Sequence, residues 1–235
     1  SAGGGAAVNN SHGGLLFALG LRGHLGALAM TDIYEYLTQG AETTTVGVLL
    51  GMAASKLGTC DASVSKMLCL HIPSLLPPPF TEMDVSSVAQ IAAVAGVGML
   101  YLGSAHRLMT EFLLGEIGRK PMSDKIADRE AYVLSAGFAL GMVNLGKGKS
   151  GAAAGLQDLK IEERLGQYLT GGQEPSGRGS GRGGSQMNRG EEGPRCSRIY
   201  EGDAINVDVT SPGATMALAL LHIRSGNRGV GAWPA

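Results

Sequence analysis

Five stretches of this sequence carry small residues at matching positions. They align on these anchor residues: Gly20, Gly51, Gly98, Gly141 and Ala219. Six and two positions before each anchor the residues are again small, with Leu49 as the exception. Positions four apart lie on one helix face, and glycine inside a helix costs about 1 kcal/mol relative to alanine. Repeating that cost indicates five closely packed helices, with Gly98 and Ala139 on surfaces that leave no room for a large side chain.

The spacing of these stretches predicts an all-α fold, an α-solenoid of helix pairs. Successive anchors are 31, 47, 43 and 78 residues apart, and the last spacing is 38 when the polar segment 171–210 is left out. A period near 40 residues is typical of such solenoids. Each of the first four small-residue inner helices is followed by a more amphipathic outer helix. In residues 106–120, for example, apolar residues recur every three to four positions beside Glu111 and Glu116. We expect a single repeat domain over 1–235. Its inner and outer helices are expected to pair over 12–40, 44–77, 86–120 and 129–170, with a final inner helix at 212–226.

Residues 173–195 interrupt the repeat. They are rich in Gly, Ser and Arg, and Met187 is their one large apolar residue. Such a segment cannot offset the entropy of ordering, so it is predicted to be a disordered insertion. The run Arg182-Gly183-Gly184 resembles an RNA-binding tract, but no aromatic residue is interleaved with the arginines. A solvated linker is therefore favoured over a nucleic-acid site.

Residues 197–210 follow a different pattern. After a turn at 201–203, the apolar residues Ile205, Val207 and Val209 alternate with polar ones. Alternation with period two predicts a strand. We therefore expect a small β-hairpin at 197–210, after which Ser211-Pro212 marks the start of the final helix.

Composition argues against several classes of partner. The net charge is −1, from 19 basic and 20 acidic residues, so no general field attracts nucleic acid or an anionic membrane. The uncharged stretch 85–105 includes Ser86, Ser87, Gln90 and three glycines, which favours a buried helix over a membrane span. The three cysteines, Cys60, Cys69 and Cys196, form no CxxC pair, so neither a disulfide framework nor a zinc site is expected. Without an initiator Met, the chain is expected to be a fragment.

No catalytic constellation is predicted. The string at 146–150, Gly-Lys-Gly-Lys-Ser, resembles a phosphate-binding loop, but the required spacing fails at Gly148 in one frame and at Val143 in the other. The string also follows a predicted helix, where carbonyl groups disfavour anions. His12 and His222 are expected to cap or pack rather than catalyse. No catalytic, cofactor-binding or metal-binding residue, no cofactor and no small-molecule substrate are therefore expected.

Several runs of residues resemble one family. Residues 14–21, 135–142 and 212–219 resemble proteasome/cyclosome repeats. Longer runs resemble, more narrowly, the family of the largest subunits of the anaphase-promoting complex. These runs are NNSHGGLLFALGLRGHL from Asn9, LHIPSLLPP from Leu70, GSAHRLMTEFLLGEIGR from Gly103, DREAYVLSAGFALGMVNLG from Asp128 and EGDAINVDVTSPGATMALA from Glu201.

This resemblance implies part of a ring of helix pairs, two layers deep, in a noncatalytic scaffold of a multisubunit ubiquitin ligase that controls mitosis. It also implies, as partners, other subunits of the complex and its coactivator, and a location in the nucleus and cytoplasm. A large non-ATPase scaffold subunit of the proteasome regulatory particle shares the repeat and is the alternative. The longer runs argue against that alternative, and the spacing at 146–150 argues against an enzyme.

Overall fold

The computed structural model describes residues 10–38, 41–77, 85–119, 128–148, 155–171 and 205–225. Within these ranges the chain forms α-helices and short 3-10 helices, and no strand occurs. The α-helices are α1 (Asn10–Leu21), α2 (Met30–Thr38), α3 (Glu42–Ser55), α4 (Ala62–Cys69), α5 (Ser87–Leu100), α6 (Arg107–Gly118), α7 (Arg129–Val143), α8 (Ile161–Thr170) and α9 (Val207–Leu221). The 3-10 helices are η1 (His24–Ala27), η2 (Pro73–Leu75) and η4 (Gln157–Leu159). The predicted all-α solenoid is confirmed.

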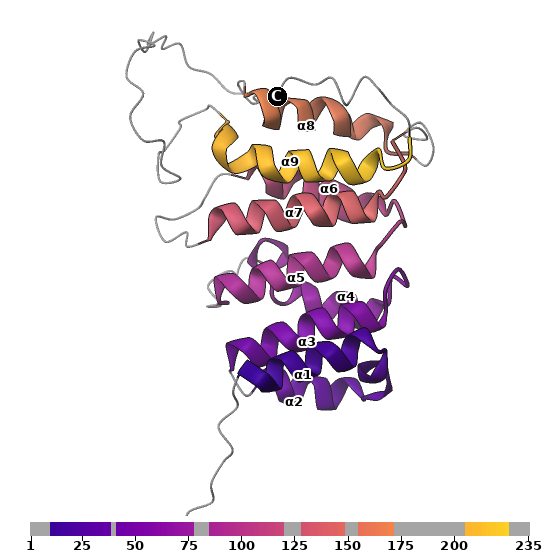
Figure 1. Ribbon diagram of the computed structural model, residues 1–235, viewed down its shortest axis with the longest axis vertical. Helices are drawn as coiled ribbons and strands as arrows, with labels where there is room; N and C mark the ends of the chain where they lie inside the picture. The colour runs from indigo at the N-terminus through magenta and orange to yellow at the C-terminus, as the bar shows by residue number, and fades with distance from the viewer. Residues whose placement is uncertain are drawn as a thin grey trace, which may run out of the picture.

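The helices form two layers (Figure 1). Helices α1, α3, α5, α7 and α9 stack side by side as the inner layer, while α2, α4, α6 and α8 lie along one side of that stack. Each of the four predicted pair ranges overlaps one inner and one outer helix, although α1 and α3 begin two residues before their ranges. The uncharged stretch 85–105 forms the buried helix that its composition predicted, with Ala93, Val94 and Val97 inaccessible to solvent. No helix of the described part is long and apolar enough to span a membrane.

Two of the outer helices, α4 and α6, begin at a side-chain cap. The carboxylate of Asp61 accepts hydrogen bonds from the backbone N–H groups of Ser63 and Val64, at 2.9 and 3.0 Å, and so begins α4. The ring nitrogen Nδ1 of His106 accepts one from the N–H of Met109 at 3.4 Å and begins α6. Each bond satisfies a donor that has no partner within its helix.

The predicted hairpin at 197–210 is wrong over residues 205–210, which are the part of it that the structure describes. Residues 207–210 form the first turn of α9 instead, and 197–204 lie outside the described residues. Asn206 caps this turn by accepting a hydrogen bond from the N–H of Asp208 at 3.1 Å. Thr210 Oγ1 donates to the carbonyl oxygen of Tyr168 at 2.7 Å, which ties the turn to α8. Val209 and Thr210 therefore begin the buried face of a helix rather than a strand, and Pro212 lies inside that helix. The predicted insertion at 173–195 also lies outside the described residues.

The structure corrects the register of the second repeat. In α3 the position equivalent to Gly98 and Gly141 is Ala53, two residues after the predicted anchor Gly51. A Cβ atom placed on Gly96 would lie 3.4 Å from the Cβ of Ala53, just as one placed on Gly141 would lie 3.2 Å from the Cα of Ala217. With Ala53 as the anchor, the position two before it is Gly51. The exception at Leu49 then disappears, because alignment by glycine alone had misplaced the helix by two residues.

Candidate functional site: the junctions between repeats and the open helix faces

Consecutive inner helices approach one another at the small residues of the repeat. Each anchor packs against the residue two positions before the next anchor. A Cβ atom placed on Gly98 would lie 2.6 Å from the Cα of Ala139, and one placed on Gly20 would lie 2.2 Å from the Cα of Gly51. Real Cβ atoms do not approach other carbons so closely. The predicted close packing at Gly98 and Ala139 is therefore confirmed.

Backbone hydrogen bonds join the repeats at one end of the inner helices. In each of three junctions, two N–H groups of the loop after one inner helix donate to the last carbonyl groups of the next inner helix. The six bonds are Gly58 to Met99 and Cys60 to Leu100, at 3.0 and 3.1 Å, Gly103 to Met142 and Ala105 to Val143, at 2.8 and 2.9 Å, and Gly146 to Leu220 and Gly148 to Leu221, at 3.1 and 2.8 Å. These carbonyl groups have no partner within their own helix. The next repeat is therefore held by backbone N–H and C=O groups, which do not depend on the side chains.

A side-chain contact accompanies each pair of backbone bonds. The residue that ends an inner helix contacts the outer helix of the preceding repeat. The contacts are Tyr101 OH with Ser65 Oγ at 2.8 Å, Asn144 Nδ2 with Thr110 Oγ1 at 3.1 Å and His222 Nε2 with Glu162 Oε1 at 3.0 Å. All three inner-helix residues are buried. The predicted packing role of His222 is therefore what the structure shows.

The loops of these junctions require left-handed backbone, which gives a test. Gly103 has φ +67°, and a Cβ atom on it would meet nothing within 4 Å. The left-handed region costs a residue with a Cβ atom about 1–2 kcal/mol. We expect Gly103→Ala to lower the free energy of unfolding by about 1 kcal/mol, measured by chemical denaturation.

The neighbouring Ala105 provides the reciprocal control, because its φ is already +52°. We expect Ala105→Gly to raise the free energy of unfolding by about 1 kcal/mol, since the strain of the Cβ atom is relieved while the N–H group still donates to Val143. Equal stability of both variants and the parent chain would show that the loop conformation is not required.

A buried ionic cluster joins α6 to α7. Glu116 is 2% exposed, and its carboxylate lies 2.7 Å from Nε of Arg119. Tyr132 OH donates to the same carboxylate at 2.7 Å. Burial raises the pKa of the Tyr132 hydroxyl, and the Glu116 carboxylate raises it further. Arg129 adds a second guanidinium, whose pKa is lowered by burial, and donates to the backbone carbonyl of Arg119. This cluster fixes the end of α6 against the start of α7.

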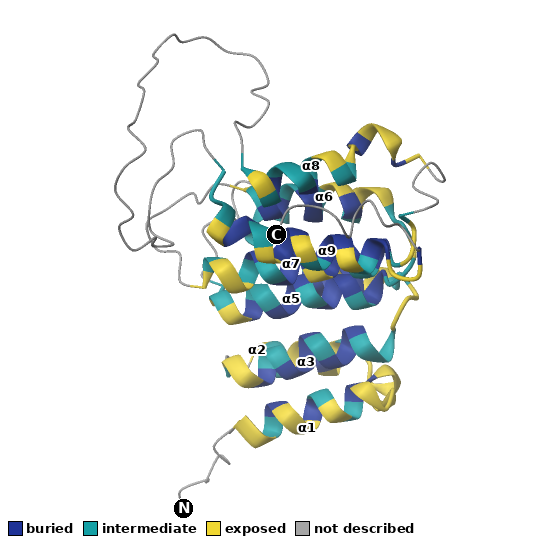
Figure 2. Cartoon of the chain, turned by 45° about the horizontal axis from the view of Figure 1, so that its top comes forward, coloured by how far each residue is buried: buried dark blue, intermediate teal, exposed yellow. Residues whose placement is uncertain are grey.

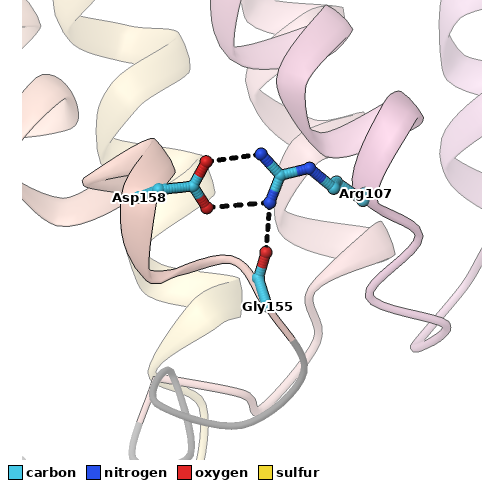
Figure 3. A network of polar contacts seen from close by, with 3 residues as sticks. All are labelled: Arg107, Gly155 and Asp158. Carbon is cyan, nitrogen blue, oxygen red and sulfur yellow. Dashed lines mark hydrogen bonds and ion pairs between the residues drawn. The ribbon is translucent and has the colours of Figure 1, made fainter.

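An exposed ion pair joins α6 to the segment that precedes α8 (Figure 3). Arg107 donates to both carboxylate oxygens of Asp158, one of them at 2.7 Å, and to the carbonyl oxygen of Gly155. The hydrogen bond between them raises the pKa of the Arg107 guanidinium and lowers that of the Asp158 carboxyl. A pair this exposed positions the loop more than it stabilises the fold.

The sequence features that resembled chemical sites lie in packing roles. Gly146 and Gly148 of the phosphate-loop-like string donate to the carbonyls of Leu220 and Leu221, so this end of α7 binds another helix. His12 lies in α1 with its ring centroid 5.8 Å from that of Tyr36. Cys69 is partly buried, which raises the pKa of its thiol. The described ranges contain no cluster of three metal-ligating side chains.

Surfaces without a covering helix remain at several places in the described structure. At the ends of the stack, Ala18 of α1 and Ala219 of α9 are exposed, and Figure 2 shows exposed residues in yellow along α1. Leu21, at the end of α1, is 61% exposed. On the inner layer, Phe138 of α7 is 37% exposed, and Val88 of α5 is also exposed. Sequence periodicity had not distinguished these positions from buried ones.

Comparison with known proteins agrees with this geometry. A family model described as the APC1 fifth domain matches residues 62–234, and one described as the APC1 fourth domain matches residues 5–57. The chain belongs to the APC1 family. The two matches meet between α3 and α4, inside one helix pair. The structure continues across that border, because Gly58 and Cys60 donate to the carbonyls that end α5.

Relatives of the APC1 family are similar over most of the chain. Anaphase-promoting complex subunit 1 of Homo sapiens is 47% identical over 97% of this chain, and that of Arabidopsis thaliana is 42% identical over 92%. The protein named negative regulator of mitosis in Emericella nidulans is 43% identical over 67% of the chain. The chain covers only 11%, 12% and 8% of these three relatives, respectively.

Proposed function

We propose that this chain is a noncatalytic scaffold segment of the anaphase-promoting complex, a multisubunit E3 ubiquitin ligase that controls mitotic progression. The observation that carries the proposal is the row of three equivalent junctions, in which small residues and backbone hydrogen bonds hold successive repeats in one register. Stacked repeats of this kind expose extended surfaces suited to binding other proteins. The relatives are named as subunit 1 of the anaphase-promoting complex, and this is why we propose that complex for the present chain.

The proposed partners are other subunits of the complex and its coactivator, and the proposed location is the nucleus and cytoplasm. The uncovered apolar residues of the inner layer, such as Val88 and Phe138, are the positions at which we expect contact with protein partners. Patches of this type on a folded protein mark interaction sites. The family matches do not favour the proteasome subunit that shares the repeat.

Deleting the region equivalent to residues 10–225 from the full-length subunit tests the proposal. We expect the affinity-purified complex to lose neighbouring subunits or coactivator, as measured by quantitative mass spectrometry, and to ubiquitinate cyclin more slowly. The purified 235-residue chain is expected to form no ubiquitin chains when mixed with activating and conjugating enzymes. Normal composition and activity of the deleted complex, or ubiquitin-chain formation by the isolated chain, would refute the scaffold role.

A further inference from the structure

The three middle inner helices, α3, α5 and α7, share one face that the outer helices do not cover. Relative to the anchors Ala53, Gly98 and Gly141, this face holds the residues ten, seven and three positions before the anchor and one position after it, since steps of three and four return to one side of a helix. All twelve residues are exposed or partly exposed, and none is charged. We call this surface the inner band. Its large apolar members include Val46, Leu50, Ile91, Met99, Phe138 and Met142.

The inner band differs from the outer helices in its lack of charge. The outer helices expose charged side chains such as Lys66 of α4, Glu111 of α6 and Glu163 of α8. On the inner band Val88 is 42% exposed and Phe138 is 37% exposed. Single exposed apolar residues are normal on a protein surface, but an apolar surface that continues over neighbouring helices marks an interaction site. Repeats flank these three helices on both sides, so the band lies within the stack.

Carboxylates line the edge of the band where the inner helices begin. The residue eleven positions before the anchor is acidic and exposed in three helices, as Glu42 of α3, Glu130 of α7 and Asp208 of α9. In α5 this position is Ser87, whose hydroxyl donates to the carboxylate of Asp128 at 2.7 Å. Acidic residues also suit the start of a helix, but here they recur at one repeat position and remain accessible to a partner.

The opposite edge, where the inner helices end, carries no described carboxylate in its junction loops. In residues 56–60, 101–105 and 144–148 the charged residues are Lys56 and Lys147, both basic. At the acidic edge the one basic residue beside Glu130 is Arg129, which donates to the carbonyl oxygen of Arg119 and is thereby directed toward α6. A basic partner residue is therefore attracted to one edge of the inner band and not to the other.

The dimensions of the inner band match one α-helix laid across the stack. From seven positions before the anchor to one after it, the band is about 12 Å wide, because a helix rises 1.5 Å per residue. A helix with its side chains is about 10–12 Å in diameter. Packed helices lie about 8–10 Å apart, so a helix of about 18 residues crosses α3, α5 and α7.

We propose that the inner band binds an amphipathic α-helix of a protein partner, which crosses α3, α5 and α7 with its apolar face on the band. Its basic residues lie along the flank that faces Glu42 and Glu130. This assignment rests on the scaffold role proposed above and specifies the chemistry of one partner. Apolar contact supplies the affinity of such a helix, and the one-sided basic flank fixes the direction in which it lies.

A labelled probe peptide tests the proposal with the 235-residue chain. The probe has about 18 residues, with leucines on one helix face, lysines along one flank and glutamines elsewhere. The control peptide has the same composition, but its lysines lie opposite the leucine face. By fluorescence anisotropy we expect the probe to bind about tenfold more tightly than the control, and salt to reduce this difference. Equal affinities, or no binding of the probe, would overturn the proposal.

Substitutions at exposed positions locate the bound probe. We expect Phe138→Ser and Glu130→Gln each to weaken its binding several-fold. The matched controls are Leu108→Ser, at a position 67% exposed in the outer helix α6, and Glu111→Gln, also exposed in α6. Both should bind the probe as the parent chain does, and circular dichroism and melting temperature verify that all four variants fold. Normal binding by both band variants, or equal losses in the controls, would place the probe elsewhere and refute the inner band as its site.

Photo-crosslinking in the assembled complex identifies the natural occupant. A photoreactive residue replaces the equivalent of Phe138 in the full-length subunit, and mass spectrometry identifies the crosslinked segment. We expect a segment with apolar residues every three to four positions and Lys or Arg along one flank. No crosslink, or a crosslink to a segment without this pattern, contradicts the proposal. If the deletion described above removes subunits while crosslinking and probe binding both fail, the scaffold role stands and the helical partner is refuted.

Discussion

Gly98→Leu is expected to lower the free energy of unfolding by about 3 kcal/mol or more, with a corresponding fall in melting temperature. A Cβ atom at this position would already lie 2.6 Å from the Cα of Ala139, which is backbone and cannot rotate away. Relieving the overlap therefore requires α5 and α7 to move apart. Leucine has a better helix propensity than glycine. Helix propensity alone would therefore make the variant more stable, so a loss of stability must come from the packing.

Gly115→Leu is the matched control, because it introduces the same side chain into a glycine of helix α6 where a Cβ atom would meet nothing within 4 Å. We expect this variant to be as stable as the parent chain or more stable, by up to about 1 kcal/mol. Urea denaturation of both variants provides the comparison. If Gly98→Leu were no less stable than Gly115→Leu, close packing at the anchors would not be what holds the inner helices.

Glu116→Ala is expected to lower the free energy of unfolding by about 3 kcal/mol, at the low end for breaking a buried ion pair. The substitution removes the carboxylate that faces Arg119 and accepts the hydrogen bond of Tyr132. Tyr132 is then left without its acceptor, and the partly buried Arg129 loses the carboxylate whose charge raises its pKa. Arg119 is partly exposed and can turn to water, which limits the loss.

Two further variants separate charge from packing at this cluster. Glu116→Gln keeps an acceptor for the Tyr132 hydroxyl, so we expect a smaller loss than with alanine. Asp158→Ala breaks an ion pair that is exposed on both sides, and we expect no measurable change in the melting temperature. Equal effects of Glu116→Ala and Asp158→Ala would contradict the assignment of Glu116 as a buried structural charge.

The inner helices were predictable because their signal is one of residue size. Small residues four positions apart at Gly137 and Gly141, or at Gly213 and Ala217, show which face another helix approaches. The limit of this signal is α3. There Gly51 was aligned as the anchor, whereas Ala53 performs that role, and only the spatial neighbour Gly96 reveals the correct register.

The final helix shows why local pattern failed before Pro212. The alternation of Ile205, Val207 and Val209 is compatible with a strand, but strands need a partner and the described residues supply none. Tyr168 offers its carbonyl oxygen to Thr210 instead. The helical start of α9 is thus fixed by a contact between residues that are 42 positions apart in the sequence. A sequence pattern read over a few adjacent residues cannot include such a contact.

The candidate site was predictable only in part. Sequence spacing excluded the phosphate loop at 146–150, and the described residues 146–148 of that string contact a neighbouring helix. Glu116, in contrast, was grouped with the exposed Glu111 on the polar side of an amphipathic helix. Its burial depends on Tyr132 and Arg119, so it follows from how α7 packs on α6. The backbone bonds of the junctions use groups common to all residues and therefore leave little trace in the sequence.

The six backbone bonds of the junctions all lie at the same edge of the stack, where the inner helices end. At the opposite edge, where those helices begin, the described repeats meet without such bonds: α1 packs on α3 at Gly13 and Gly47, and α7 packs on α9 at Gly137 and Gly213, with backbone against backbone. Hydrogen bonds weaken steeply once their geometry is distorted, whereas packed surfaces can slide over a small distance and stay in contact. Mechanically, the segment is a strip with one edge pinned by directional bonds and one edge that can slide. A force that moves one repeat past the next is therefore resisted mainly at the pinned edge, and the strip bends about that edge.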